Sequence, residues 1–156
     1  MRKIEINIEI LEYNFEELTS EEKELINQSK KARDNAYAPN SNFKVGAALK
    51  LDNDQIILGN NQENKASPSG LCAERVALFH YGSLNTDHKI SAMAVCANNK
   101  TENYNEVIKP CGGCLQVMAE YETKQDSEID IYLYSNEGKV WKAKGVKSFL
   151  PLIFKM

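Results

Sequence analysis

The sequence predicts a three-layer α/β/α sandwich on a mixed sheet of about five strands, with an extra strand near the N-terminus. Two observations lead to this fold class. Segments with alternating apolar residues and segments with helical spacing follow one another in the order strand, helix, two strands, helix, strand, helix, two strands. Helices that connect strands in this way cover both faces of a sheet, because right-handed crossovers place them there.

The chain has room for one hydrophobic core. Its 156 residues include 42% hydrophobic side chains, which suffices for one domain and is too little for two of ordinary size. We therefore expect a single domain over residues 1–156, in which residues 1–17 form an N-terminal extension and residues 18–156 form the core.

The N-terminal extension has the pattern of a strand. Isoleucine alternates with polar residues over residues 4–10, which places every second side chain on one face. This pattern predicts a half-buried strand that runs at one edge of the sheet.

A helix is expected next, followed by a hairpin. Thr19 and Glu22 have the spacing of a capping box, and apolar residues from Leu25 onward share one helical face. Pro39 limits this helix. Alternating apolar residues on both sides of a polar turn indicate a hairpin over residues 43–60.

The second half of the chain alternates helices with strands. After a polar loop, a mostly buried helix that includes Phe79 is expected from Cys72 to about Gly82. The small apolar residues 90–97 indicate a central strand.

Another polar loop leads to a second buried helix that opens at Cys111. Residues 129–134 alternate as a strand does, and a turn at residues 136–138 leads to a last strand around Val140.

Composition excludes several classes of function. The formal net charge is −3, and no Lys/Arg block resembles a surface that follows a phosphate backbone, so nucleic acid is not expected as a partner. The N-terminus lacks the continuous apolar stretch of a secretory signal, and no segment has the length and apolarity of a membrane span. Four cysteines in such a chain indicate a reducing compartment, so we expect a cytoplasmic enzyme.

Two short motifs carry the chemistry. Cys72 opens the motif Cys-Ala-Glu-Arg, and Cys111 and Cys114 belong to Pro-Cys-Gly-Gly-Cys. Each motif is expected at a helix N-terminus, where free backbone N–H groups and the helix dipole favour a thiolate. A structural zinc takes four protein ligands, whereas a hydrolytic zinc keeps three and leaves one position for water. Three cysteines with Glu74 nearby fit the second arrangement.

Three thiolates on Zn²⁺ leave a net negative charge, which opposes the activation of water. Arg75 is placed to donate hydrogen bonds to thiolate sulfur, so we expect it to tune the metal centre from outside the ligand set. Glu74 is expected as a free carboxylate that moves protons, because this chemistry needs one.

These motifs resemble those of the zinc-dependent nucleoside deaminases. The chain is similar to cytidine deaminases of the small homotetrameric type with three cysteine ligands. The similarity extends from about Ala36 to Phe154 and includes residues 37–49, 61–64 and 150–154. The resemblance implies a cytidine deaminase-like fold, one Zn²⁺ per subunit and shared active sites in a homotetramer. It also implies hydrolysis of cytidine or deoxycytidine to uridine or deoxyuridine with release of ammonia, as in pyrimidine salvage.

The resemblance further implies a set of substrate-binding residues. Asn61 and Glu63 would bind the ribose, Phe43 would line the base pocket, Ala73 would belong to the same site, and Phe154 would reach into a neighbouring subunit. A buried carboxylate such as Glu63 needs donors, and sugar hydroxyls supply them. In the implied reaction Glu74 carries one proton from the attacking water to the ring nitrogen, and a second proton transfer through Glu74 releases ammonia.

Three positions depart from the common family pattern. Asn40 and Ser67 stand where many relatives carry tyrosine, and Leu115 replaces an arginine that usually follows the last cysteine. These changes suggest a roomier pocket that accepts pyrimidine nucleosides with a substituted amine.

Two other classes of function stay open at this point. The chain could be a non-catalytic zinc-binding interaction domain in which Cys96 or His80 completes the coordination. It could also be a dithiol oxidoreductase that uses Cys111 and Cys114, although Cys72 and Glu74 would then have no role.

Overall fold

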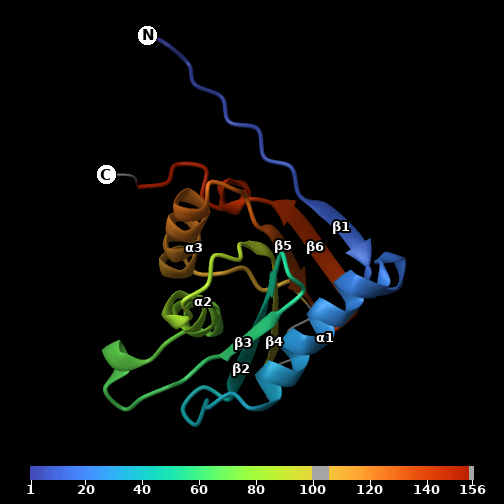
Figure 1. Ribbon diagram of the computed structural model, residues 1–156, viewed down its shortest axis with the longest axis vertical. Helices are drawn as coiled ribbons and strands as arrows, with labels where there is room; N and C mark the ends of the chain where they lie inside the picture. Colours follow the sequence, from blue (N-terminus) through green and yellow to red (C-terminus); the bar gives the residue numbers. More distant parts are fainter. Residues whose placement is uncertain (100–105, 155–156) are drawn as a thin grey trace.

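Within the residues that the computed structural model describes, 1–99 and 106–154, six strands form one mixed sheet (Figure 1). The strands are β1 (Leu11–Asn14), β2 (Phe43–Leu51), β3 (Ile56–Asn60), β4 (Ile90–Asn99), β5 (Asp130–Tyr134) and β6 (Lys139–Lys144), in the spatial order β1-β6-β5-β4-β2-β3. The β4–β5 pair is parallel and the other neighbours are antiparallel. The predicted mixed sheet and its extra strand are therefore confirmed.

Helices cover both faces of this sheet, as predicted. The α-helices are α1 (Ser20–Asp34), α2 (Ala73–Ser83) and α3 (Gly112–Gln125), and short 3₁₀ helices span Phe15–Glu17, Ser67–Ser69 and Val146–Ser148. On one face, Leu25 and Ile26 of α1 pack with Tyr132. On the other, Leu78 of α2 and Met118 of α3 belong to the larger apolar cluster.

Two glycines let the helices approach the sheet closely. A Cβ atom on Gly46 of β2 would lie 2.0 Å from the Ser29 carbonyl oxygen of α1. A Cβ atom on Gly59 of β3 would lie 2.4 Å from the Ala77 nitrogen of α2. Because no real side chain fits at such distances, glycine at these positions fixes where α1 and α2 sit.

The capping box and the hairpin are confirmed, and two other predictions are corrected. The Thr19 hydroxyl accepts from the Glu22 N–H, and the Glu22 carboxylate accepts from the Thr19 N–H. Phe79, expected in a buried helix face, is 46% exposed, because it lies on the side of α2 that the sheet does not cover.

The strand predicted over residues 4–10 is also wrong in position. The edge strand comprises Leu11–Asn14 and pairs with β6, whereas residues 1–10 have no regular structure and extend away from the body (Figure 1). Alternation supplied a strand propensity for residues 4–10, but pairing with β6 stops at Leu11. No helix in the described residues is both long and apolar enough to span a bilayer.

Candidate active site

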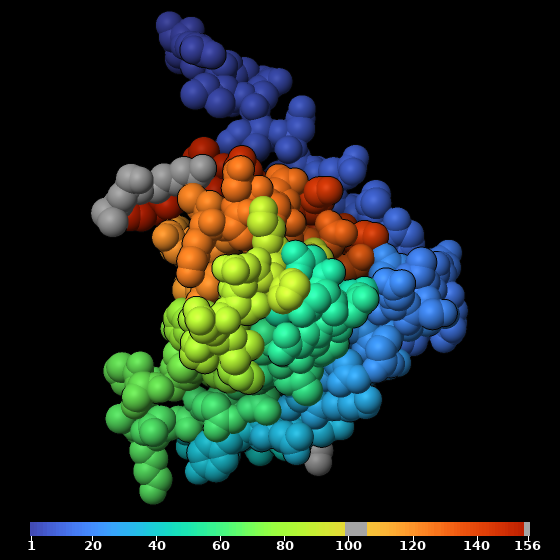
Figure 2. Space-filling view, in the orientation of Figure 1, coloured from blue at the N-terminus to red at the C-terminus, as the bar shows by residue number. Residues whose placement is uncertain are grey.

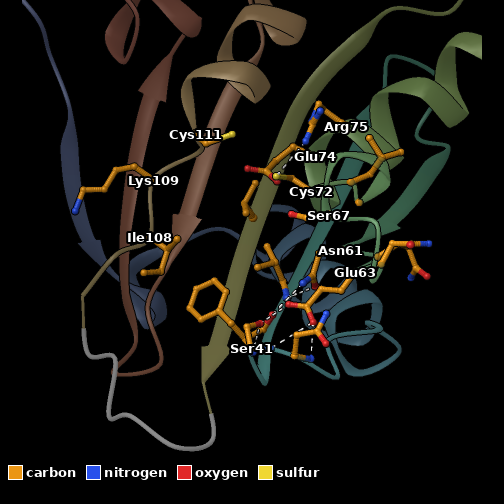
Figure 3. A pocket seen from close by; sticks show the side chains of 18 residues that line it. Ser41, Asn61, Glu63, Ser67, Cys72, Glu74, Arg75, Ile108, Lys109 and Cys111 are labelled. Atoms are coloured by element: carbon orange, nitrogen blue, oxygen red, sulfur yellow. Dashed lines mark hydrogen bonds between the residues drawn. The ribbon is translucent and has the colours of Figure 1, made fainter.

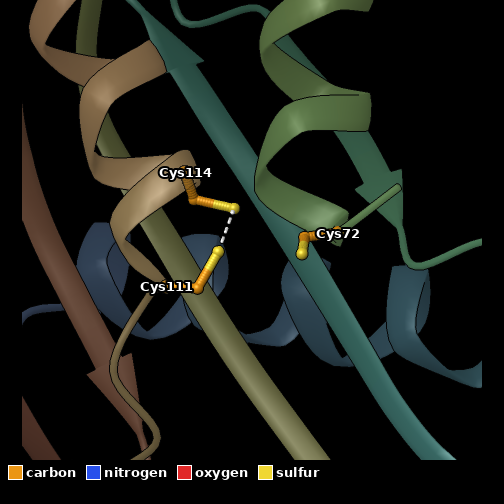
Figure 4. A group of neighbouring side chains, drawn as sticks. All are labelled: Cys72, Cys111 and Cys114. Carbon is orange, nitrogen blue, oxygen red and sulfur yellow. Dashed lines mark hydrogen bonds between the residues drawn. The ribbon is translucent and has the colours of Figure 1, made fainter. Parts of the chain in front are cut away.

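The N-termini of α2 and α3 bring three cysteines together. Cys72 is the N-cap of α2, Cys111 is the N-cap of α3, and Cys114 lies in the first turn of α3. Their Sγ atoms all lie within 4.8 Å of one another and point toward a common centre (Figure 4). The Cys111 thiol donates to Cys114 Sγ at 3.5 Å. The predicted convergence of the two motifs is confirmed.

The electrostatics of this cluster favour one thiolate when no cation is bound. A hydrogen bond from the Cys114 thiol, supported by Arg75, lowers the pKa of Cys72 to about 5. Donation to Cys72, together with burial, raises the pKa of Cys114 well above its ordinary value. A second thiolate is therefore unfavourable beside the first, unless a cation offsets the added charge.

This donor set fits a zinc ion. Three cysteine sulfurs are ligands that zinc prefers, and a divalent cation would allow all three to ionise. Arg75 Nη2 donates to Cys72 Sγ at 3.6 Å, which places its positive charge beside the ligand set as predicted.

Glu74 lies in the first turn of α2, next to the cysteines and outside the cluster of sulfur atoms. Its side chain is 4% exposed. Burial disfavours its charged form and raises the pKa of Glu74 to about 7, and the neighbouring Cys72 thiolate acts in the same direction. A carboxyl group in this environment can both accept and donate a proton near neutral pH.

A cavity of about 620 Å³ opens beside Cys72 and Glu74. In Figure 3, Cys72, Glu74 and Arg75 lie at one end, and Ser41 and Glu63 lie at the other. The remaining lining comes mainly from β2, the loop after β3 and the segment before α3: Asn40, Phe43, Val45, Asn61, Gln62, Asn64, Ser67, Gly70, Leu71, Val95, Ile108, Lys109 and Cys111. The cavity thus joins the sulfur cluster to most of the predicted substrate residues.

The far end of the cavity is organised around Glu63. Its carboxylate accepts from the Asn40 N–H at 2.8 Å, from the Ser41 N–H at 3.3 Å and from the Ser41 hydroxyl. The Ser41 hydroxyl is the main cause that lowers the pKa of Glu63. Glu63 is therefore a fixed, charged acceptor at the cavity wall.

Asn61 is held by the backbone of β2. Its Oδ1 accepts from the Val45 N–H at 2.8 Å, and its Nδ2 donates to the Phe43 carbonyl oxygen at 2.9 Å. These bonds use one lone pair and one hydrogen of the amide, which has two of each. Asn61 therefore has hydrogen-bonding capacity left for a ligand.

Two predicted residues do not line this cavity. Ala73 is fully buried in the apolar cluster. Phe154 is 70% exposed on the C-terminal segment, and its carbonyl oxygen accepts from Gln116 at 3.1 Å.

The structure also adds residues to the site. Ser41 orients Glu63, and Ile108 and Lys109 form part of the wall directly before the second cysteine motif. Proximity to Pro110 and Cys111 in the sequence was the signal that could have indicated Ile108 and Lys109. Among the three departures, Asn40 and Ser67 line the cavity, whereas Leu115 is buried in the apolar cluster.

Neither side chain considered as a fourth protein ligand lies with the sulfur cluster. Cys96 interacts with Ser29 of α1 and therefore faces the opposite side of the sheet. His80 is exposed and lies two turns along α2. Within residues 1–99 and 106–154, the group of close metal ligands consists of Cys72, Cys111 and Cys114. This arrangement disfavours a structural zinc with four protein ligands.

Comparisons with known proteins agree with this geometry. The family described as "Cytidine and deoxycytidylate deaminase zinc-binding region" matches residues 19–126. A cytidine deaminase from Sporosarcina psychrophila is 38% identical over 130 residues, which is 83% of this chain and 88% of that protein. A cytidine deaminase from Halalkalibacterium halodurans is 37% identical over 131 residues, with coverage of 83% and 91%.

Solved structures give the same result. The crystal structure of cytidine deaminase from Burkholderia pseudomallei has a TM-score of 0.72 and 34% identity, and the match covers 88% of this chain and all (100%) of that chain. Cytidine deaminase from Mycobacterium tuberculosis has a TM-score of 0.62 and 27% identity, with coverage of 85% and 96%.

Proposed function

The chain belongs to the cytidine and deoxycytidylate deaminase family, and we propose that its cavity is where cytidine or deoxycytidine is hydrolysed to uridine or deoxyuridine. One observation carries this proposal: three cysteine sulfurs converge at two helix N-termini, and the buried carboxyl group of Glu74 lies beside them in the cavity wall. Metal ligands and a proton carrier are the two elements that hydrolytic deamination requires.

Cys72, Cys111 and Cys114 would hold one zinc ion, which supplies Lewis acidity for the addition of water to the ring carbon that bears the amine. Arg75 offsets part of the negative charge of the sulfurs through its bond to Cys72. The positive charge of Arg75 favours the ionised thiolates. It also offsets part of their negative charge, so that a bound zinc would remain a stronger Lewis acid than it would beside three unbalanced thiolates.

Glu74 moves the protons. Its carboxylate accepts one proton from the attacking water and delivers it to the adjacent ring nitrogen as the new C–O bond forms. The second proton of the water then passes through Glu74 to the amino group, the C–N bond breaks, and ammonia leaves. Glu74 ends in the state in which it began, and the ring carries a carbonyl group. Because Glu74 is 4% exposed, bulk water does not compete for these transfers.

The other end of the cavity would hold the sugar. Glu63 offers carboxylate oxygens to ribose hydroxyls, and Asn61 offers its second lone pair and hydrogen. Phe43, which is half-buried in the cavity wall, offers an apolar face to the pyrimidine ring.

We also propose a homotetramer with shared active sites, in which Phe154 serves a neighbouring subunit and the domain core begins at residue 18. The 70% exposure of Phe154 supports this arrangement, because a large apolar side chain is expected to find cover. A cytoplasmic location agrees with the free state of all four cysteines.

The assignment of the sugar end is tested with Glu63→Gln, which leaves the shape of the side chain and removes its charge. KM for cytidine should rise about tenfold or more, as expected when a charged hydrogen bond is lost, with a smaller change in kcat. Glu137→Gln is the matched control, since Glu137 is exposed and does not line the cavity. Equal KM values for the two variants would refute the role of Glu63.

A second substrate class is supported by Asn40 and Ser67, which line the cavity where bulkier aromatic residues are common in the family. Ser67 lies beside Cys72 in Figure 3, where its small side chain leaves space for a substituent on the exocyclic amine, whereas Asn40 lies at the sugar end beside Glu63. Turnover of an N-alkylated cytidine measures this capacity, and Ser67→Tyr should lower it more than it lowers turnover of cytidine. No reaction of the alkylated compound with the unmodified protein would exclude this substrate class.

A further inference from the structure

Residues 2–10, here called the arm, have the sequence of a strand but pair with no strand among the residues that the structure describes. They project from the body of the protein in both views (Figures 1 and 2). Ile4, Ile6 and Ile8 are 78%, 48% and 51% exposed. Isoleucine has a high strand propensity, and the strict alternation places these side chains on one face of an extended chain.

Strand β6 is too short to pair with the whole arm. In the β1–β6 pair, Leu11 is opposite Lys142. The same register would place Ile10 opposite Ala143 and Glu9 opposite Lys144, where β6 ends. Beyond that point the Gly145 N–H donates to the Ile129 carbonyl oxygen, and a 3₁₀ helix begins at Val146. Residues 2–8 therefore extend past the end of the sheet.

An extended segment with a row of exposed isoleucines, which lies beyond the last residue paired with β6, is a template for strand addition. Charge indicates which strand fits. The polar positions of the arm are Lys3, Glu5, Asn7 and Glu9, so a partner must present a positive charge opposite Glu9 and a negative charge opposite Lys3. An antiparallel copy of the arm meets both conditions.

We propose that the arms of two copies of this chain pair as antiparallel strands, with Ile6 opposite Ile6 on the two-fold axis. In this register Ile4 faces Ile8, and Glu5 faces Asn7. Lys3 faces Glu9 twice, once on each side of the axis, and all isoleucine pairs lie on one face. In the single chain Lys3 pairs instead with Glu5, and both side chains are largely exposed, so little is lost when Lys3 changes partner.

Neighbouring registers are unfavourable. A shift of two positions in one direction places Glu5 opposite Glu5, and a shift in the other direction places Glu5 opposite Glu9. Both create like-charge pairs, which destabilise a sheet. A shift of one position places isoleucine opposite a polar residue and divides the apolar face.

A two-stranded ribbon is marginal when it is isolated, but the arm is not isolated. It continues directly into β1, which is already fixed on β6. Pairing therefore extends an existing sheet and orders fewer residues than the formation of a free ribbon would. The proposal concerns association alone and does not depend on the deaminase activity.

Cross-linking tests the register. In the zinc-loaded protein, Ile6→Cys places two thiols opposite each other across the axis, within the Cα separation that a disulfide spans. Asn7→Cys, the matched control, places its thiol opposite Glu5 on the other face. With oxidised glutathione, Ile6→Cys should form a covalent dimer about tenfold faster or more than Asn7→Cys on a non-reducing gel. The unmodified protein measures any background from the native cysteines.

Charge exchange supplies a second, independent readout. In the Ile6→Cys background, Lys3→Glu alone and Glu9→Lys alone should each slow dimer formation, because each creates like-charge pairs. The double variant should restore the original rate. Equal cross-linking at positions 6 and 7, or a double variant as slow as the single ones, would overturn the proposal. Deaminase activity, which does not involve the arm, should be unchanged in all variants and reports that each one folds.

Discussion

Two glutamates lie in the first turns of helices on opposite faces of the sheet, and their pKa values are shifted in opposite directions. Glu22 lies in the first turn of α1, and Glu74 lies in the first turn of α2. Burial alone would raise the pKa of Glu22, but hydrogen bonds from Lys142, Thr19 and Tyr132 outweigh it and lower the pKa to about 2. Burial of Glu74 raises its pKa to about 7.

The difference lies in the partners and not in the local sequence. Lys142 Nζ donates to Glu22 at 2.8 Å, the Tyr132 hydroxyl at 2.9 Å and the Thr19 N–H at 2.9 Å. The charge of Glu22 is thus neutralised and its lone pairs are used. Glu74 is more deeply buried and has the Cys72 thiolate as a neighbour. The first turn of a helix therefore holds an ionised carboxylate on one face of the sheet and a carboxyl group with a pKa near neutrality on the other.

The largest expected effect is at Glu74. Glu74→Gln keeps the side chain's shape but cannot carry a proton, so kcat should fall about 10³- to 10⁴-fold. Zinc content and thermal stability should be unchanged, because the cysteines stay and a costly buried carboxyl group is removed. Ammonia release from cytidine, metal analysis and a melting curve measure the three quantities. Activity near that of the unmodified protein would refute the proton-carrying role.

The same substitution at Glu22 should lower stability and leave kcat unchanged. Glu22→Gln removes the charge that pairs with Lys142 and should lower the free energy of unfolding by about 1–3 kcal/mol, with kcat unchanged. Glu24→Gln is the control, since Glu24 is exposed and contacts only Gln28 and Lys31 among the described residues; its expected change is about 0.5 kcal/mol or less. Urea unfolding compares the two variants. Equal stability of both would show that the ion pair contributes nothing.

A smaller effect is expected in the acid stability of the protein. Because the pKa of Glu22 falls from 4.5 to about 2 on folding, its contribution is complete above about pH 4.5 and is lost as the pH falls toward 2. Stability should therefore decrease through this interval in the unmodified protein and less steeply in Glu22→Gln. Urea midpoints between pH 5 and pH 2.5 measure the slope, and identical slopes would contradict the pKa assignment.

Short sequence patterns predicted most helices and strands, but they did not predict which residues far apart in the chain contact one another. The capping box of Thr19 and Glu22 could be predicted because it involves residues three positions apart. The bonds of Glu22 to Tyr132 and Lys142 join residues 110 and 120 positions apart, and no spacing in the sequence indicates them. The prediction of a strand over residues 4–10 was wrong for a related reason. Alternation gives a strand propensity, but a strand also requires a neighbouring strand with which to pair.

The residues of the candidate site likewise include some that the sequence could predict and some that it could not. Cys72, Cys111 and Cys114 could be predicted to converge because their chemistry demands a shared ion and their helices start at these residues. The bond between Ser41 and Glu63 could not, because it joins residues 22 positions apart in two different loops.

Zinc-edge X-ray absorption spectroscopy on freshly purified protein tests the central claim most directly. We predict one zinc per chain with three sulfur neighbours at about 2.3 Å and one lighter neighbour, oxygen or nitrogen, at about 2.0 Å. Glu74→Gln should give the same spectrum, because Glu74 is free of the metal. A fourth sulfur, a changed spectrum in that variant, or no zinc in active protein would contradict the account.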